Sequence, residues 1–186
     1  MKIPRVLSLR VALSLLFVVT PLVALVIVGS ITLAIRLPQV AEENRTIAKE
    51  SAAEMAARVE QYLRSLEHRL KVLAAAVDNV PEQEVYFLLQ TARGDGFDAI
   101  YLVDEQGILV DASVKNYSIE YIEEIVGIDM SGNKLFRTVT ETHKQAWSDT
   151  QLSSISGIVT VGVAVPLAGS NKIIIGEVPL DQIVSI

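Results

Sequence analysis

Glu177 is the residue of this sequence whose type and position most directly suggest chemistry. It lies between Gly176 and Val178 in the largely apolar run of residues 172–178. A carboxyl group in such a run is predicted to be buried, where it needs a polar or charged partner or takes a raised pKa. Glu177 is therefore a candidate for binding a positively charged group. The alternative is a structural ion pair, for which Arg137 is the candidate partner.

Three further side chains each have a structural and a functional interpretation. Trp147 either packs in a core or forms one wall of a pocket, because a strand that borders a pocket allows both. Asp149 either serves as a turn residue at a strand end or takes part in a site. Tyr101 alternates with Ile100 and Leu102, so it lines either the core or a pocket.

The sequence contains none of the short patterns that are typical of catalytic or cofactor sites. It has no Gly-x-x-x-x-Gly-Lys-Ser/Thr, no His-Glu-x-x-His and no Gly-x-Ser-x-Gly. It also has no cysteine, which excludes disulfides, thiolate nucleophiles and zinc–thiolate sites. His68 and His143 lie far apart and are interpreted as surface residues. We therefore expect no catalytic residue, cofactor or metal ion within these 186 residues.

An uncharged apolar run near the start of the chain predicts a membrane anchor. Between Arg10 and Arg36 there are 25 consecutive residues without a charge. At about 1.5 Å per residue they form roughly 37 Å of helix, which exceeds the ~30 Å hydrocarbon core of a bilayer. A cleaved signal peptide is the competing interpretation, but its apolar region is usually only about 7–15 residues long. We expect a retained transmembrane helix over residues 11–36.

The distribution of charge predicts the orientation of this helix. Residues 1–10 carry three basic side chains and no acid, whereas residues 37–186 carry 12 basic and 22 acidic ones. This bias, although modest close to the span, favours a cytoplasmic tail at residues 1–10 and an outer part beyond the bilayer. Folding without disulfides fits a bacterial periplasm, so we expect the inner membrane as the location. The acidic outer part argues against nucleic acid as a partner.

Residues 37–80 are predicted to form one long helix outside the membrane. Apolar residues follow an alternating 4-3 spacing, and we call them the seam: Ala52, Ala56, Val59, Leu63, Leu66, Leu70, Leu73 and Val77. Pairs with favourable i, i+4 charge lie on the other side of the helix: Glu54–Arg58, Glu60–Arg64 and Glu67–Lys71. The seam either packs on the chain's own sheet or joins two copies in a homodimer, and the spacing fits both.

The rest of the chain predicts an α+β domain with a five-stranded antiparallel sheet. Strands are expected at residues 99–103, 108–110, 145–149, 157–167 and 172–178, and helices at residues 82–93, at residues 118–125, and from a cap at Asp129 or Ser131 to His143. The long helix would cover one face of the sheet, and the helical insert would face the other. A pocket is expected between the sheet and this insert.

Several stretches resemble the Cache domain, a PAS-like extracytoplasmic sensor module of bacterial receptors. They are "YLVDEQGILV", "VGIDMSGNKLF", "AWSD", "GIVTVGVAVPL" and "KIIIGEVPLDQI". The resemblance covers residues 37–186, and the anchor followed by a long helix is similar to the start of a double-Cache receptor. It implies the strand order 2-1-5-4-3 and makes residues 81–186 the membrane-distal module. The chain is accordingly expected to be a fragment of a longer receptor.

The resemblance also implies a function and a set of ligand contacts. Cache receptors hold a small ligand between sheet and insert and signal to a cytoplasmic kinase, chemoreceptor or cyclic-dinucleotide domain. Members that bind amino acids carry Arg-x-Trp on the insert, Tyr-x-Asp on the next strand and an acid on the last strand. Here Trp147-Ser148-Asp149 and Glu177 match the last two in altered form, but Arg137 is followed by Thr138 and Val139. The implied ligand-binding residues are Tyr101, Arg137, Trp147, Asp149 and Glu177.

Without Arg-x-Trp, a ligand carboxylate lacks its expected partner unless Arg137 serves, whereas Asp149 and Glu177 can hold an ammonium group. An amine, an amino acid and a carboxylate all stay open as ligands. Two other functions also stay open. One is a membrane-anchored scaffold whose outer domain binds a protein partner, and the other is an anchored enzyme whose catalytic domain lies outside this sequence.

Overall fold

The computed structural model describes residues 9–94 and 96–185. Contacts divide the chain into two compact units, residues 1–54 and residues 55–186. The described part of the first unit belongs to helix α1 (Leu9–Val77). Most of the expected cytoplasmic tail, residues 1–8, lies outside the described residues. Among the residues that the structure describes, no helix combines the length and the apolar character that a membrane crossing requires.

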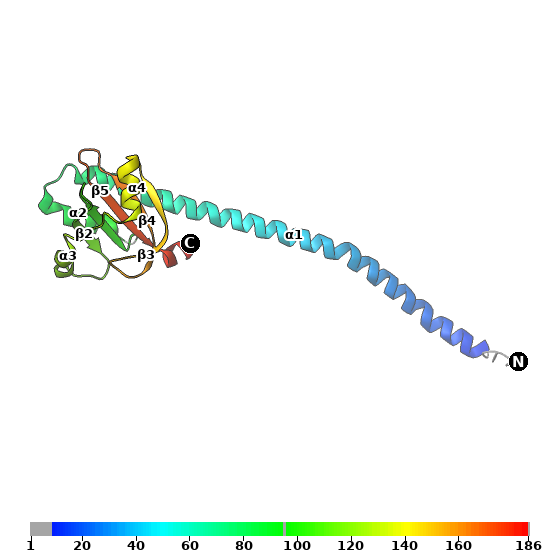
Figure 1. Ribbon diagram of the computed structural model, residues 1–186. Helices are drawn as coiled ribbons and strands as arrows, with labels where there is room; N and C mark the ends of the chain where they lie inside the picture. Colours follow the sequence, from blue (N-terminus) through cyan, green and yellow to red (C-terminus); the bar gives the residue numbers. More distant parts are fainter. Residues whose placement is uncertain (1–8, 95, 186) are drawn as a thin grey trace. The chain divides into compact units, whose positions relative to one another are not determined.

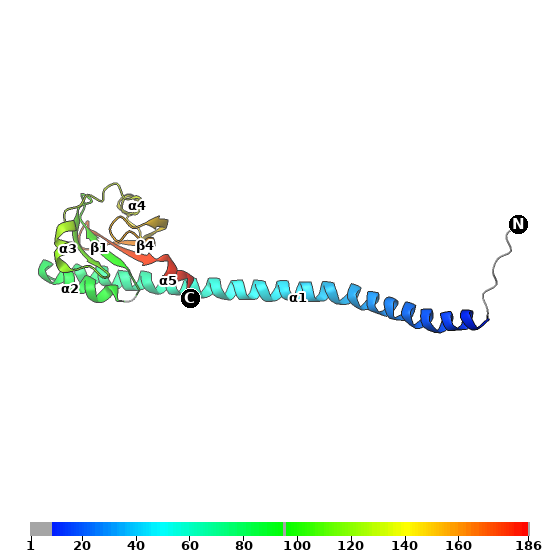
Figure 2. The same ribbon diagram turned by 90° about the horizontal axis from the view of Figure 1, so that it is seen from below.

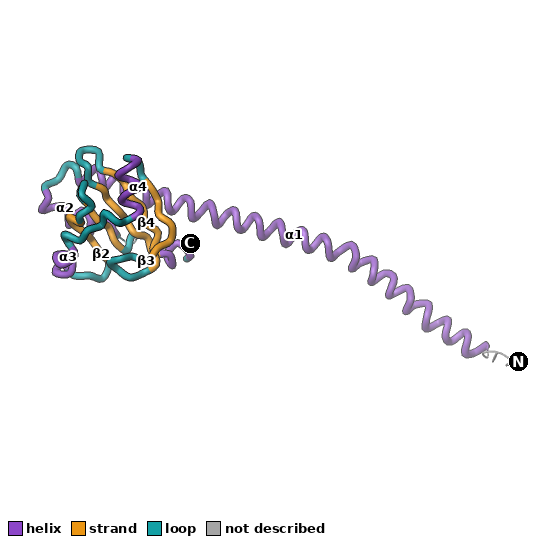
Figure 3. The backbone as a smooth tube through the Cα atoms, viewed as in Figure 1, coloured by secondary structure: helices purple, strands orange, loops and turns teal. Residues whose placement is uncertain are grey.

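The second unit contains a five-stranded antiparallel sheet (Figures 1 and 3). Its strands are β1 (Ala99–Val103), β2 (Leu109–Val114), β3 (Ala146–Leu152), β4 (Val159–Pro166) and β5 (Ile173–Pro179). Its remaining helices are α2 (Glu82–Arg93), α3 (Ile119–Ile125), α4 (Lys134–Thr142) and α5 (Leu180–Val184). The strand order β2-β1-β5-β4-β3 confirms the predicted α+β fold and topology. Helix α5 was not expected.

Helices cover both faces of the sheet, as Figure 2 shows for this unit, with α2 and the end of α1 on one side and α4 on the other. Side chains alternate between the two faces along each strand. Ile100, Leu102 and Ile174 belong to the core against α1 and α2. Tyr101 and Ile175 belong to the core against the insert, which α3 and α4 form.

The seam of α1 divides at Leu66. Its last four members, which are Leu66, Leu70, Leu73 and Val77, are buried in the core on the sheet. Ala56 is exposed, and Leu63 is half-buried. Packing on the chain's own sheet is thus confirmed for the C-terminal half of the seam. On the other side of the helix, Glu60 pairs with Arg64 at 2.6 Å and Glu67 with Lys71 at 2.9 Å, as the i, i+4 spacing predicts.

The cap of α4 differs from the expectation. Asn133 is the N-cap, and its side-chain oxygen accepts hydrogen bonds from the backbone N–H groups of Leu135 at 2.8 Å and Phe136 at 3.2 Å. Capping by Asp129 or Ser131 was therefore wrong. The Asp129 carboxylate instead accepts a hydrogen bond from the N–H of Ser131 in the turn before the helix. Both residues are engaged in this turn and do not cap the helix.

Replacement of this cap is expected to loosen the insert that faces the pocket. Asn133→Ala leaves two N–H groups of the first turn without their acceptor, so we expect a loss of about 1 kcal/mol in the free energy of unfolding. Urea denaturation of the full chain measures it. Glu141→Ala, a change at an exposed position of the same helix, is the control, and an equal loss in both variants would contradict the role of the cap.

Candidate functional site

Glu177 and Tyr101 lie side by side on the insert face of the sheet. They belong to the paired strands β5 and β1, in which Ala99 is opposite Glu177 and Tyr101 is opposite Ile175. Glu177 is 4% exposed and Tyr101 is fully buried. The Tyr101 hydroxyl donates a hydrogen bond to Glu177 Oε2 at 2.8 Å. The predicted buried carboxyl group is therefore present, and its partner is a neutral phenol.

Burial sets the protonation of this pair. It raises the pKa of Glu177, and although hydrogen bonds to Ser153 and Tyr101 oppose this, the charge of nearby Asp98 adds to the increase. The pKa of Tyr101 lies well above its usual value, because burial and the Glu177 charge both disfavour the phenolate. Among the described residues, no Lys or Arg side chain forms an ion pair with Glu177. An added cation would consequently be stabilised here.

Arg137, the alternative structural partner of Glu177, lies elsewhere. It is exposed on α4, whereas Glu177 is in the protein interior. Since a buried ion pair requires both charges to leave water, an exposed guanidinium does not provide it. The ion pair between Arg137 and Glu177 that the sequence allowed is thus not formed in the structure, and the ligand-binding role of both residues stays a prediction.

A groove lies between α4 and β3. Its volume is about 240 Å³, and residues 134–138 of α4 and 147–151 of β3 contribute to its walls. Gly162 of β4 is directly opposite Glu177 in the β4–β5 register. A Cβ atom at Gly162 would lie 3.0 Å from Leu135 Cδ2 and 3.3 Å from Ser148 Oγ, both on groove residues. The missing side chain at this position therefore lets Leu135 and Ser148 pack closely on β4.

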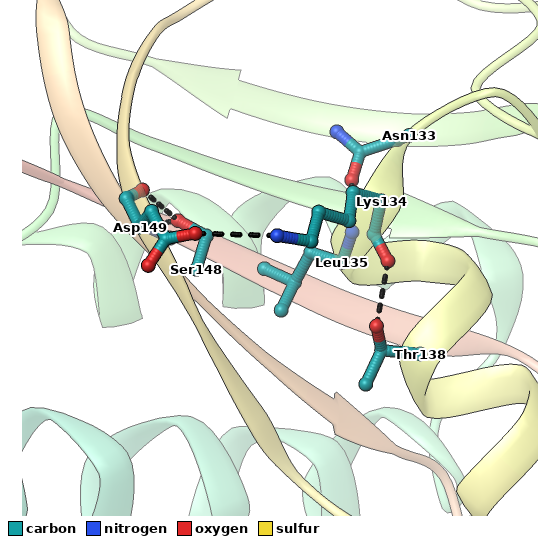
Figure 4. Close-up of polar contacts among 7 residues, drawn as sticks. Asn133, Lys134, Leu135, Thr138, Ser148 and Asp149 are labelled. Carbon is teal, nitrogen blue, oxygen red and sulfur yellow. Dashed lines mark hydrogen bonds and ion pairs between the residues drawn. The ribbon is translucent and has the colours of Figure 1, made fainter.

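Asp149 lies on the exposed side of this groove. Lys134 of α4 reaches across and its Nζ donates to Asp149 Oδ2 at 3.2 Å, as Figure 4 shows. The two side chains are 80% and 90% exposed, so the bridge contributes little to stability. Asp149 is thus part of the groove wall, held by a contact that a ligand can replace at low cost, while Glu177 lies in the interior.

Trp147 contacts α1 on the opposite face of the sheet. Its indole Nε1–H donates to Glu67 Oε2 at 3.2 Å, and Gln145 donates to Glu67 Oε1 at 2.6 Å. The pKa of Glu67 is lowered, chiefly by its hydrogen bond to Lys71. The β3–β4 register shifts between Trp147 and Thr150. Trp147 is half-buried against the α1 core and also borders the groove. Its packing role is thus present in the structure, and its role in ligand binding stays a prediction.

Four residues near Glu177 were not singled out from the sequence, namely Asp98, Ser153, Thr160 and Gly162. Asp98 is 8% exposed, Ser153 3% and Thr160 0%. Asp98 precedes β1, and its backbone N–H donates to the Glu177 backbone oxygen at 2.8 Å. No local pattern marks these positions, because only the pairing of distant strands brings them to Glu177.

The raised pKa of Glu177 predicts a specific dependence of stability on pH. In the unfolded chain Glu177 ionises near pH 4.5, but in the folded chain it holds its proton to higher pH. Its contribution to stability is therefore present below pH 4.5 and is lost as the pH rises through the folded pKa. Glu177→Gln keeps an acceptor for Tyr101 and never ionises, so we expect it to melt above the wild type at pH 8, with the difference shrinking toward pH 5.

Thermal melts at several pH values check this expectation. Glu141→Gln, at an exposed position, should leave the melting temperature within about 1 °C of the wild type at each pH, because surface changes of this kind have small effects. A difference between Glu177→Gln and the wild type that is the same at pH 5 and pH 8 would rule out a raised pKa.

Comparisons with known proteins identify the fold. The sequence matches no protein-family model and no curated protein. Among solved structures, the sensory domain of the Campylobacter jejuni chemoreceptor Tlp3 with isoleucine bound has a TM-score of 0.57 at 12% identity, over 69% of this chain and 56% of that one. The chain has the fold of a chemoreceptor sensory domain.

Two Pseudomonas receptors give the same result. The ligand-binding domain of the P. aeruginosa PAO1 amino acid chemoreceptor PctC, in complex with GABA, has a TM-score of 0.57 at 15% identity, over 75% of this chain and 63% of that one. The ligand-binding domain of the P. fluorescens chemoreceptor CtaA, in complex with L-isoleucine, has a TM-score of 0.56 at 16% identity, over 70% and 54%. This chain therefore spans little more than half the length of these sensory domains.

Proposed function

We propose that this chain is the small-ligand-sensing region of a membrane-bound bacterial signal-transduction receptor, with residues 81–186 as the sensor module. The ligand enters the groove between α4 and β3 and places an ammonium group on Glu177. The observation that carries the proposal is a buried carboxyl group that has no cationic partner among the described residues. A groove also lies between β3 and α4, the helix that covers the same face of the sheet. Burial of such a carboxyl group is costly unless a ligand compensates it.

The fold supports the same function. Its sheet and helical insert are those of sensory domains whose solved complexes contain isoleucine or GABA, and both of these molecules carry an amino group. The groove lies between sheet and insert, where a concave surface with a few polar groups is the usual form of a small-molecule site. An amine or an amino acid is accordingly the proposed ligand.

We further propose that residues 11–36 anchor the chain in the bacterial inner membrane, with residues 1–10 in the cytoplasm and residues 37–186 in the periplasm. The support is the uncharged run of 25 residues, together with exposed apolar side chains on α1 such as Phe17 at 77% and Leu25 at 75%. Lipid is the solvent that such a surface suits. If the membrane fraction releases the full chain on alkaline carbonate extraction, the anchor is refuted.

The part of the α1 seam before Leu66, which is not buried on the sheet, supports a homodimer. Met55 is 65% exposed, and the adjoining seam residues Ala56, Val59 and Leu63 border an open apolar groove on this helix. A parallel helix from a second copy would cover these side chains with the same 4-3 spacing. Sedimentation of the full chain with and without a Val59→Glu change tests this proposal.

Thermal-shift measurements on the full chain test ligand binding. We expect at least one compound in a panel of amines, amino acids and carboxylates to stabilise the chain, by about 2.7 kcal/mol at a hundredfold its Kd. Gly162→Val should abolish the shift, because the added side chain would press on Leu135 and Ser148, which line the groove. Gly132→Val, at a glycine with no neighbouring atom within 4 Å of a Cβ, is the control. No shift with any compound would refute the proposal and favour a protein partner.

A further inference from the structure

A second groove lies on the face of the sheet that α1 and α2 cover, at the end where β4 turns into β5. Its volume is about 350 Å³, which lies within the range of roughly 300–1,000 Å³ that is usual for small-ligand clefts. The end of α1, the first turn of α2, strands β1 and β2, and the β4–β5 turn all border it. Six aliphatic side chains contribute to its walls: Val77, Val80, Val85, Leu102, Val110 and Leu167.

Asp111 brings a negative charge to the second groove. It is directly opposite Leu102 in the β1–β2 register, so its side chain lies on the face covered by α1 and α2. Asp111 is half-buried, and burial raises the pKa of its carboxyl group. Its Oδ1 accepts the N–H of Ala112 at 2.7 Å, but no Lys or Arg side chain of the described residues forms an ion pair with it. An ammonium group would therefore stabilise this carboxylate.

Lys172 brings a positive charge to the same groove. Its side chain is 30% exposed, and its Nζ lies 3.5 Å from Glu82 Oε1 of α2. The Glu82 side chain is 87% exposed, so this ion pair contributes little to stability and a ligand carboxylate can replace it at low cost. The second groove thus offers one group of each charge beside aliphatic side chains.

The β4–β5 turn is held to the end of α1, which fixes one wall of the second groove. Asp78 directly follows α1, and its carboxylate accepts the Gly169 N–H at 2.8 Å and the Ser170 hydroxyl at 3.4 Å. All three residues border the groove. A Cβ atom at Gly169 would lie only 3.2 Å from Asp78 Cγ, so a glycine suits this close approach. A wall that is in place before the ligand enters lowers the cost of binding.

We propose that the second groove binds a zwitterionic amino acid with an aliphatic side chain. Asp111 binds the ammonium group, Lys172 binds the carboxylate, and the ligand side chain packs on the valines and leucines of the walls. This site is separate from the groove between α4 and β3, so the inference goes beyond the proposed function. A ligand with a single charge engages only one of the two charged residues.

Three compounds with the same aliphatic group test the inference on the full chain. L-Leucine carries both charges, 3-methylbutylamine lacks the carboxylate, and 4-methylpentanoate lacks the ammonium group. Isothermal titration calorimetry gives the Kd of each compound. We expect L-leucine to bind about tenfold more tightly than either analogue, because each analogue loses one charge-assisted hydrogen bond. The inference is overturned if L-leucine does not bind or if either analogue binds as tightly, and these results need no variant.

Two variants assign the binding to the second groove. Asp111→Asn should reduce the preference for L-leucine over 4-methylpentanoate to about threefold or less, and Lys172→Gln should do the same for the preference over 3-methylbutylamine. Lys115→Gln, at an exposed lysine, is the control and should leave both preferences unchanged. Preferences that also stay unchanged in the two groove variants overturn the inference.

Glu177→Gln separates the inference from the proposed function. If this variant binds L-leucine like the wild type while Asp111→Asn binds it more weakly, the inference stands and the proposed contact with Glu177 fails. If Glu177→Gln abolishes L-leucine binding and Asp111→Asn leaves it unchanged, the proposed function stands and the inference is wrong.

Discussion

Leu70→Ala is expected to reduce the free energy of unfolding of the sheet unit by about 3–5 kcal/mol, the usual loss for a fully buried leucine. Leu70 has no exposed surface and lies in the core that α1 forms with the sheet. A Cβ atom at Gly176 of β5 would lie only 3.4 Å from Leu70 Cδ1, so this leucine packs directly on the strand that carries Glu177. Its truncation leaves a cavity under the site.

The chain contains one tryptophan, which makes the measurement direct. Trp147 lies against α1, so its fluorescence during urea denaturation reports the separation of helix and sheet. Val72→Ala on the same helix is the matched control, because Val72 is 57% exposed and should lose less than about 1 kcal/mol. Equal losses at the two positions would show that this part of α1 does not pack as described.

Gly107→Ala is expected to cost about 3 kcal/mol or more, because two separate penalties combine at this turn. The φ angle of Gly107 is +87°, a region that costs a residue with a side chain about 1–3 kcal/mol. An added Cβ would also lie 2.7 Å from Ser131 Cα, and overpacking of this kind costs about 1–3 kcal/mol. The change would push the β1–β2 turn away from the insert. In the wild type the Met130 N–H donates a hydrogen bond to the Gly107 oxygen at 2.7 Å, which joins the turn to the insert.

Two other glycines separate the penalties. Gly127 has a φ of +92° but no atom within 4 Å of an added Cβ, and Gly132 has open space without a positive φ. In urea denaturation the loss should therefore be largest for Gly107→Ala, intermediate for Gly127→Ala and smallest for Gly132→Ala. Equal losses for Gly107→Ala and Gly127→Ala would exclude the contact with Ser131 as a source of destabilisation.

Much of the fold is predictable from local sequence. The helix at residues 82–93 was predicted with the bounds that α2 has in the structure. The resemblance to Cache domains supplied the strand order that the structure confirms. The approach of Ser131 to Gly107 was not predictable, because the two residues are 24 positions apart and only tertiary packing joins them.

The site was predictable only in part. Glu177 is recognisable because a carboxyl group in an apolar strand is unusual, and Tyr101 follows from strand alternation. Asp98 and Thr160 carry no such signal, since an acid before a strand and a threonine within one are ordinary features of exposed edges. Their burial depends on how β1, β4 and β5 pair. The roles of Glu177 and Tyr101 in ligand binding stay predictions until the variants are measured.

The contacts of β3 have a thermodynamic consequence. Trp147 holds this strand to Glu67 of α1, and two residues later Asp149 holds it to Lys134 of α4. A ligand that displaces β3 from α4 thereby also alters the strand's contact with α1. Linkage between two equilibria is reciprocal. If a ligand changes the equilibrium constant for the contact between residues 67 and 147, any factor that fixes this contact changes the affinity for the ligand by the same ratio. Restraint applied to the helix would thus tune the affinity for the proposed ligand.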